Sequence, residues 1–249
     1  MYVRLKHTLS ALTLEALRRP ARNRARAAAV WLVAFCDLVI KQGAAGEPAR
    51  FDLPVSAVGA RARRAGGAAA GVRRLLDAGL LARHDGWLSL PEGFRPHFAY
   101  MNRQVHRLAA AIRAVDRATR GGGGRGERAT IATGVAMFNA GLFFECHEFL
   151  EAVWRIAPPA DRAFYHGIIL VAAAFYHYEK GNLHGARIKL AQGMKALQPY
   201  LPEAHGVRLD RWMAALAPWR NLVEAGQVTG VLNPSEIPRM ALTRARGGS

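Results

Sequence analysis

One stretch of the sequence concentrates side chains that could bind a metal ion. His147 and Glu151 are four residues apart, so on a helix they share one face, and Trp154 lies one turn further on. His166 and His177 are eleven residues apart, about three helical turns, and therefore share a face as well. If the two faces meet, a carboxylate lies among several imidazoles. Such a donor set suits Zn²⁺ or another divalent cation.

The same residues have structural interpretations too. Glu148 completes the string His-Glu-x-x-Glu, but a zinc-peptidase helix requires a second histidine at the position of Glu151. A buried His147–Glu151 pair beneath Trp154 could instead form a hydrogen-bonded network that fixes helix register, with Asn139 as a turn partner. The sequence leaves three alternatives open: a structural network, metal binding without catalysis, and hydrolytic or other catalysis.

Four amphipathic segments would position these side chains. Short connections containing Gly or Pro separate them, as between antiparallel neighbours of a bundle. The expected helices are Ile131–Arg155, Asp161–Glu179, Leu183–Leu197 and Val207–Ala225. We therefore expect residues 129–249 to form an antiparallel helical bundle.

The segment Phe138–Trp154 resembles the signature of the domain-of-unknown-function 309 family. The hallmark His-x-x-x-Glu-x-x-Trp is matched by His147, Glu151 and Trp154, and two later segments also fit, Gly167–His177 and Gly181–Ala186. The resemblance covers about residues 130–200 and implies a compact helical domain, a suspected metal site and no assigned reaction. One position departs from the pattern, because His166 stands where such proteins typically carry glutamine.

Positive charge is concentrated in the N-terminal half. The chain has a formal net charge of +17; residues 1–128 carry 23 Lys and Arg against 9 Asp and Glu, whereas residues 129–249 carry 12 against 9. A basic domain beside a nearly neutral one is typical of proteins that bind a polyanion. The abundance of Arg, Ala and Gly is also what a GC-rich genome produces, so charge alone leaves both explanations open.

The N-terminal half has the element order of a winged helix-turn-helix domain. A helix over residues 23–42 is followed by a second that begins at Pro54 and a third that ends near Gly79. Asp85-Gly86 is a hairpin signal between two short β-like segments. This order predicts a small domain with a β-hairpin wing.

The run Val72–Arg83 resembles the exit of the recognition helix in bacterial winged-helix regulators, and the resemblance covers about residues 25–92. It implies that the third helix enters the major groove of duplex DNA. The N-terminal turns of that helix, Gly66–Gly71, offer no side-chain hydrogen bonds to base edges, so we expect weak sequence specificity and strong salt dependence. The candidate DNA-contacting residues are Arg61, Arg63, Arg64, Arg73, Arg74 and Arg83.

A further helix is expected before a glycine-rich linker. Its apolar residues form a heptad stripe that either packs on its own domain or makes a homodimer. The stripe consists of Phe98, Met101, Val105, Leu108, Ile112 and Val115. The expected organisation is a winged-helix-like basic domain over 1–95, a connecting or dimerisation helix over 96–120, a linker over 121–128 and a bundle over 129–249.

Several functional classes are disfavoured. Two cysteines, Cys36 and Cys146, lie in apolar helical patterns, which argues against a disulfide scaffold and for the cytoplasm. Asp37 interrupts the apolar run 27–40, the N-terminus lacks a secretory pattern, and we expect no membrane contact. Gly121–Gly126 lacks the Lys-Ser/Thr of a phosphate loop.

The sequence as a whole predicts a mainly α, cytosolic, DNA-associated or regulatory protein whose bundle serves as a sensor or interaction module. The sequence leaves enzymatic activity open and favours a role without catalysis. Two alternatives stay open: a metal-dependent, hydrolase-like enzyme centred on His147 and Glu151, and a protein-interaction scaffold.

Overall fold

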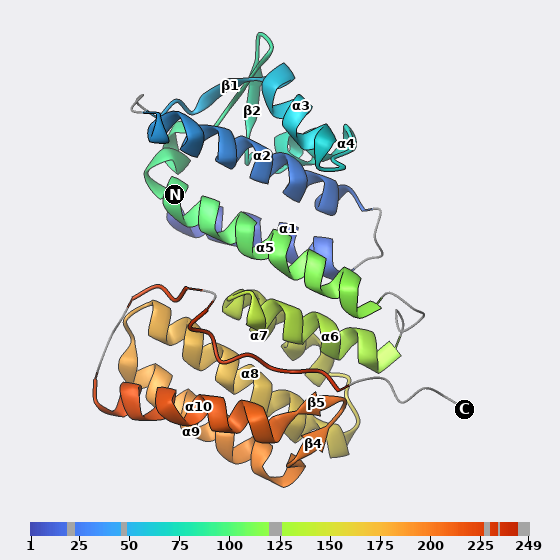
Figure 1. Ribbon diagram of the computed structural model, residues 1–249, viewed down its shortest axis with the longest axis vertical. Helices are drawn as coiled ribbons and strands as arrows, with labels where there is room; N and C mark the ends of the chain where they lie inside the picture. Colours follow the sequence, from blue (N-terminus) through green and yellow to red (C-terminus); the bar gives the residue numbers. More distant parts are fainter. Residues whose placement is uncertain (19–22, 46–48, 120–125, 227–229, 234, 244–249) are drawn as a thin grey trace. The chain divides into compact units, whose positions relative to one another are not determined.

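The computed structural model describes residues 1–18, 23–45, 49–119, 126–226, 230–233 and 235–243. The protein is mainly helical, as predicted, and divides into two compact units, Met1–Arg113 and Ala114–Ser249 (Figure 1). Of the glycine-rich segment expected as a linker, residues 121–125 lie outside the described residues, and Gly126 begins a helix.

The N-terminal unit combines helices with a small sheet. Its elements are α1 (Tyr2–Arg18), α2 (Arg24–Ala44), β1 (Asp52–Pro54), α3 (Val55–Arg64), α4 (Ala70–Asp77), β2 (Ala82–His84), β3 (Trp87–Ser89), the 3₁₀ helix η1 (Glu92–His97) and most of α5 (Phe98–Thr119). The three helices and the hairpin expected over residues 23–90 are present. α1 is additional, since the sequence analysis predicts no helix there.

α2 is the helix on which α1, α3 and α4 pack. The Asn23 side chain caps its N-terminus by accepting a hydrogen bond from the Arg26 N–H, 2.7 Å away. The Trp31 indole N–H donates to the Ala68 carbonyl, 3.0 Å away, which fixes the turn between α3 and α4 against α2. The second contact therefore helps to set where α4 lies in the unit.

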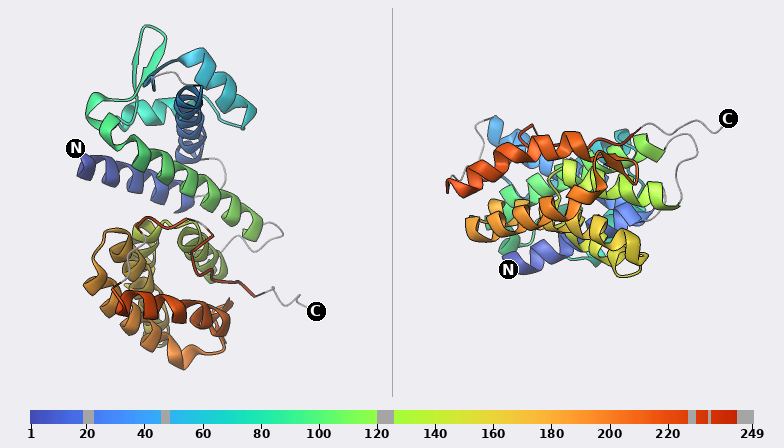
Figure 2. Two further views of the ribbon diagram at one scale, coloured as in Figure 1. Left: turned by 60° about the vertical axis from the view of Figure 1, so that its left-hand side comes forward. Right: turned by 90° about the horizontal axis from the view of Figure 1, so that it is seen from below.

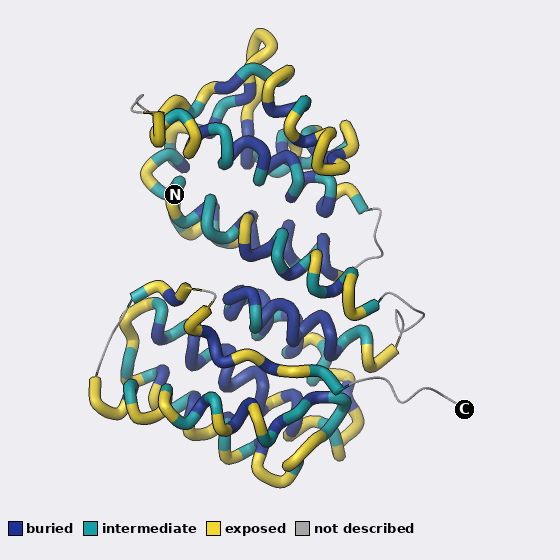
Figure 3. The backbone as a smooth tube through the Cα atoms, viewed as in Figure 1, coloured by how far each residue is buried: buried dark blue, intermediate teal, exposed yellow. Residues whose placement is uncertain are grey.

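The sheet places a hairpin at the surface. Its strands are antiparallel in the order β1-β3-β2, with Leu53 opposite Leu88 and His84 opposite Trp87. Asp85 and Gly86 have φ angles of +44° and +81°, the conformation that a two-residue hairpin turn requires. The tip of the hairpin projects from the helices (Figure 2) and is exposed (Figure 3).

Among the described residues, α2 alone is long and apolar enough to cross a membrane by length and composition. A core helix of a soluble protein passes the same test, and 44% of the apolar window of α2 is buried. The helix also has three others of its own unit packed on it. The absence of membrane contact stays a prediction.

The heptad stripe of α5 is largely buried. Met101, Val105 and Leu108 are at most 1% exposed, and Phe98 packs edge-on against the ring of Phe51 at 5.3 Å. Burial within the single chain favours packing over dimerisation as the role of this stripe. A homodimer stays a prediction that would need another surface.

The C-terminal unit is a helical bundle, as predicted. Its main elements are α6 (Gly126–Asn139), α7 (Phe143–Trp154), α8 (Pro159–Glu179), α9 (Leu183–Leu197), the 3₁₀ helix η2 (Gln198–Tyr200), β4 (Glu203–Ala204), β5 (Val207–Arg208) and α10 (Leu209–Glu224). α8 packs against both α7 and α9, and α10 packs against α9. Asn182 caps α9 by accepting a hydrogen bond from the Gly185 N–H at 2.9 Å.

The prediction of a single helix over Ile131–Arg155 is wrong, because two helices, α6 and α7, cover this range. The helix is interrupted between α6 and α7, where Gly141 has a φ of +79°. The Leu142 N–H reaches the Met137 carbonyl and the Gly141 N–H reaches the Phe138 carbonyl, both at 2.9 Å, which is the hydrogen-bond pattern of a glycine-terminated helix. The apolar run continues through the break, so periodicity alone concealed it.

An aromatic cluster forms the centre of the bundle. The ring centroid of Phe138 lies 5.3 Å from Phe143, 5.5 Å from Phe175 and 5.2 Å from Trp212, each in an edge-on arrangement. The Trp212 indole N–H is satisfied by the Pro238 carbonyl at 2.9 Å. These contacts join α6, α7, α8, α10 and the C-terminal segment into one core.

Candidate nucleic-acid interface and candidate metal centre

Two of the six arginines predicted to contact DNA are paired within their own unit. Arg74 Nη2 lies 2.8 Å from Glu15 Oε2, which joins α4 to α1. The Arg61 guanidinium contacts one carboxylate oxygen of Asp37, and His106 Nε2 lies 3.1 Å from the other. These two arginines therefore hold helices together, and their charge is partly neutralised.

The other four arginines are exposed, and none has an ion-pair partner among the described residues. They flank the turn after α3, lie on α4 and lie on the first strand of the hairpin. They are Arg63, Arg64, Arg73 and Arg83. Guanidinium groups without a carboxylate partner are suited to phosphate oxygens, which they bind through two parallel hydrogen bonds.

Two glycines, Gly67 before α4 and Gly71 in its first turn, are explained by packing. A Cβ at Gly67 would lie 2.9 Å from the Ala62 carbonyl oxygen, and a Cβ at Gly71 would lie 2.5 Å from that of Ala27. Larger residues would push α4 away from α3 and α2. Residues 66–71 themselves carry no polar side chain to read bases, in agreement with the expected weak specificity.

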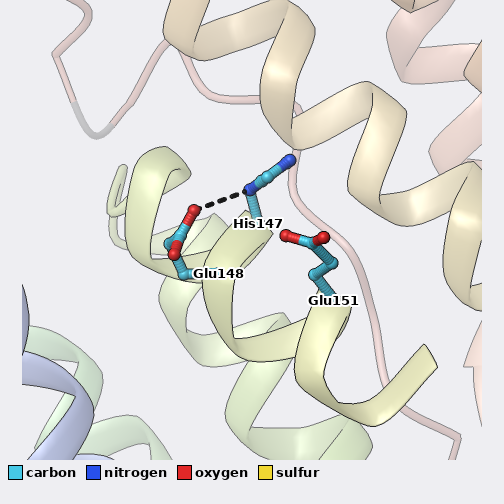
Figure 4. A group of neighbouring side chains, drawn as sticks. All are labelled: His147, Glu148 and Glu151. Atoms are coloured by element: carbon cyan, nitrogen blue, oxygen red, sulfur yellow. Dashed lines mark hydrogen bonds and ion pairs between the residues drawn. The ribbon is translucent and has the colours of Figure 1, made fainter. Parts of the chain in front are cut away.

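Three donor side chains of α7 lie together in the bundle. The ligand atoms of His147, Glu148 and Glu151 all lie within 4.8 Å of one another. His147 Nδ1 is 3.3 Å from Glu148 Oε1, and the Glu151 carboxylate points toward the imidazole (Figure 4). Each side chain is about one-third exposed, so solvent and ions reach the group. Arg155 Nη2 lies 2.7 Å from Glu151 Oε1 and would compete with a cation.

The structure does not bring His166 and His177 into this group. His166 is exposed and stacks on the Trp154 indole, with ring centroids 5.8 Å apart. His177 lies near the other end of α8, where its Nδ1 is 3.0 Å from the Asn182 amide nitrogen. The eleven-residue spacing places them about three turns apart along the 21-residue α8. Within the described part of the chain, the group on α7 is the one that has metal-ligand geometry.

Asn139 has a role that its position in the motif did not indicate. Its amide nitrogen donates to the Met240 carbonyl at 2.8 Å, and its carbonyl oxygen accepts from the Met240 N–H at 2.9 Å. The pair fastens the C-terminal segment to the end of α6. Such a contact, 101 residues apart in the chain, leaves no local sequence signal.

Neither cysteine is placed for chemistry. Cys36 and Cys146 are both fully buried, and burial raises the pKa of each thiol well above its usual range. The Cys146 thiol contacts the Gly134 carbonyl at 3.5 Å. Both side chains act as core residues, in line with the sequence analysis.

A polar cluster that the sequence analysis missed joins three parts of the bundle. His205, in the turn between β4 and β5, places Nδ1 2.5 Å from Glu127 Oε1 and Nε2 3.4 Å from Asp161 Oδ1. Its ring lies on Phe164, with centroids 4.3 Å apart. The Tyr165 hydroxyl donates to Glu127 at 3.3 Å, and burial together with the Glu127 charge raises the pKa of Tyr165 to about 12. The members are too scattered in sequence to form a motif.

Comparison with known proteins identifies part of the bundle. Residues 131–188 match a family model described as "Domain of unknown function (DUF309)". The chain is also 42% identical over 57 residues to the "Uncharacterized protein YpuF" of Bacillus subtilis strain 168, a match that covers 22% of this chain and 33% of that protein. The chain thus spans about a third of the length of the curated relative that it matches.

No solved structure matches the chain. The matched segment contains the His147, Glu148 and Glu151 group, and neither comparison names an activity. The predicted resemblance to the domain-of-unknown-function 309 family is therefore confirmed for residues 131–188.

Proposed function

We propose that residues 24–90 form a winged helix-turn-helix domain that binds duplex DNA with weak sequence specificity. Two features of the fold support the assignment. The elements follow the order α2-β1-α3-α4-β2-β3, and β1 pairs with β3, the second strand of the hairpin, so that β1 and β2 form the two edges of the sheet. In this domain class the equivalents of α4 and the hairpin contact DNA.

The observation that carries the DNA-binding proposal is the set of four exposed arginines without carboxylate partners among the described residues. Arg63 and Arg64 end α3, Arg73 lies on α4 and Arg83 lies on β2. Their positions on the elements that meet DNA favour contact with phosphates. Contacts of this kind release condensed counterions, so the affinity falls steeply as salt increases.

The C-terminal bundle would then act as a sensor or partner-binding module of a cytosolic regulator. This role is consistent with its compact core and its small excess of charge, with 12 Lys and Arg against 9 Asp and Glu over residues 129–249. The scaffold alternative has less support, because the α5 stripe that would bind other chains is mostly buried.

The experiment is fluorescence anisotropy of labelled duplex DNA with the full-length protein over a salt series. Binding at low salt with a steep salt dependence, and with similar affinity for unrelated sequences, is the expected result. Absence of binding at low salt would remove the proposal and leave the charge as a property of composition.

A metal centre is the second candidate function. The observation that favours it is the group of His147, Glu148 and Glu151 on α7, whose donor atoms lie within 4.8 Å of one another and whose side chains are partly exposed. One imidazole and two carboxylates suit zinc, and an ion held by three protein ligands keeps a position open for water or substrate. Bound zinc would supply an activated water molecule. The Arg155 contact with Glu151 would have to open first.

Equilibrium dialysis against Zn²⁺ tests this second candidate. Retention of a single ion per chain, lost on mutation of His147, would support it. A protein that takes up no zinc, manganese or other divalent cation at near-neutral pH would exclude a metal-dependent enzyme centred on this helix.

A further inference from the structure

The hairpin of the N-terminal unit carries a large aromatic side chain at the surface. Trp87, the first residue of β3, is 47% exposed, whereas its neighbour Leu88 is fully buried beneath the sheet. Directly opposite Trp87 on β2 is His84, whose side chain is 88% exposed. Because opposed residues of paired strands share a face, the indole and the imidazole stand together on the outer face of the hairpin.

The strand that carries the Trp87 indole is fixed by its neighbours. Pro54 on β1 lies opposite Trp87 on the other side, so β3 is paired on both edges. The Gly86 carbonyl accepts a hydrogen bond from the Val55 N–H at 2.9 Å, which fastens the hairpin turn to the first residue of α3. A flat ring on a fixed strand loses little conformational freedom when it binds.

The charge around the hairpin indicates the class of partner. Arg83 precedes His84 on β2 and is exposed, and the unit as a whole is strongly basic. The one carboxylate of the turn, Asp85, already lies 2.9 Å from His84 Nε2. An exposed aromatic ring in a basic setting fits a ligand that combines flat rings with negative charge, which describes a nucleic acid.

Continuous duplex covers the faces of its bases, and the glycine- and alanine-rich residues 66–71 that lead into α4 have no side chain to read base edges in the major groove. An unpaired base exposes a face on which an indole can stack. Resting on the DNA binding proposed above, we propose that Trp87 stacks on an unpaired base. The protein then prefers DNA in which duplex adjoins a single-stranded end over blunt duplex.

The test compares two labelled DNAs that share one duplex, one blunt and one with a short single-stranded overhang, by anisotropy with the full-length protein at one salt concentration. Wild type should bind the overhang DNA about 10-fold more tightly, which is within the range found for a single base stacked on an aromatic side chain. Trp87→Ala should remove this preference and leave blunt-duplex affinity within about 2-fold, and Trp87→Phe should retain part of it. Circular dichroism checks that each variant is folded.

Equal affinity of wild type for the two DNAs, or an overhang preference that persists in Trp87→Ala, would overturn the stacking proposal. So would a Trp87→Ala variant that loses affinity equally for both, because the indole would then act within intact duplex. In each of these cases the binding of blunt duplex still stands. Failure of wild type to bind either DNA would instead refute the DNA-binding proposal itself.

Discussion

Gly71 of α4 lies directly against the backbone of Ala27 in α2: a Cβ at Gly71 would come within 2.5 Å of the Ala27 carbonyl carbon and oxygen. The helix proposed to face DNA is therefore placed by a backbone-to-backbone contact that only glycine permits. The same contact explains why position 71 carries no side chain that could read a base edge.

Replacing this glycine should destabilise the N-terminal unit. Gly71→Ala places a methyl group in the contact with Ala27, so α4 must shift, and overpacking of this kind costs roughly 1–3 kcal/mol. Denaturant unfolding followed by circular dichroism measures the change. Gly43→Ala is the matched control, because a Cβ at Gly43 in α2 meets nothing within 4 Å and alanine favours helix. Equal effects of the two substitutions would contradict the packing argument.

The neighbouring arginines of α4 should have separable roles. Arg73 is exposed without a described partner, whereas Arg74 lies 2.8 Å from Glu15. Arg73→Gln should weaken DNA binding and reduce the salt slope by about 1. Arg74→Gln should reduce the free energy of unfolding by up to about 1 kcal/mol and change the salt slope less. Anisotropy measures the salt slope of DNA binding and denaturant titration measures the stability of both variants. A larger loss of salt slope in Arg74→Gln than in Arg73→Gln would contradict the roles assigned to the two arginines.

If the group on α7 binds zinc, mutation of His147 should reduce the zinc affinity and mutation of His177 should not. His147→Ala removes a donor from the group on α7 and should weaken Zn²⁺ binding by at least roughly 100-fold, because the loss of a hydrogen-bond partner behind a ligand already costs about 10–100-fold. His177→Ala alters a histidine that lies beside Asn182, outside that group, and should leave zinc affinity unchanged. Equilibrium dialysis compares the three proteins. Similar losses in both variants would mean that the ion binds elsewhere.

The phenol of Tyr165 should ionise at a higher pH than an ordinary tyrosine does. Its pKa is raised from an ordinary value of 10.0 to about 12 by burial and by the negative charge of Glu127. Because the folded state holds the neutral phenol more firmly than the unfolded chain does, this stabilisation is complete below pH 10 and is lost as the pH rises toward 12. The difference in tyrosinate absorbance between wild type and Tyr165→Phe isolates this group.

Glu127→Gln provides the companion variant for that titration. Removing the charge next to the phenol should lower the pKa of Tyr165, although burial still keeps it above its ordinary value. A Tyr165 that titrates like an exposed tyrosine in wild type would show that its hydroxyl does not face Glu127 across the 3.3 Å contact.

Local sequence signals predicted those parts of the fold that depend on local chemistry. Asp85-Gly86 indicated the hairpin because its turn needs two positive φ angles. Asn182 and Pro199 bound α9, and the helix runs over the expected Leu183–Leu197. The break at Gly141 was missed because an isolated glycine within an apolar run has little effect on periodicity.

The candidate metal site was harder to predict from the sequence, because its geometry depends on which helices pack against one another. His147 and Glu151 could be paired from their spacing within one helix, and Glu148, the neighbour of His147 in sequence, belongs to the same group. Whether His166 and His177 approach that helix depends on how α8 lies against α7, which no spacing reports. The contacts of Asn139 with Met240 and of His205 with Glu127 span 101 and 78 residues and are equally invisible in the sequence.

In the proposed function, the exposed arginines of the N-terminal unit bind DNA phosphates. The most direct test compares salt slopes of duplex binding for wild type, a variant with Arg63, Arg64, Arg73 and Arg83 changed to Gln, and a control with exposed Arg187, Lys195, Arg211 and Arg220 of the bundle changed to Gln. Both variants lose the same charge. The first should bind far more weakly, with its slope reduced by roughly 3 to 4, while the control keeps most of the wild-type slope. Equal slopes in the two variants would show that these four arginines do not contact DNA phosphates.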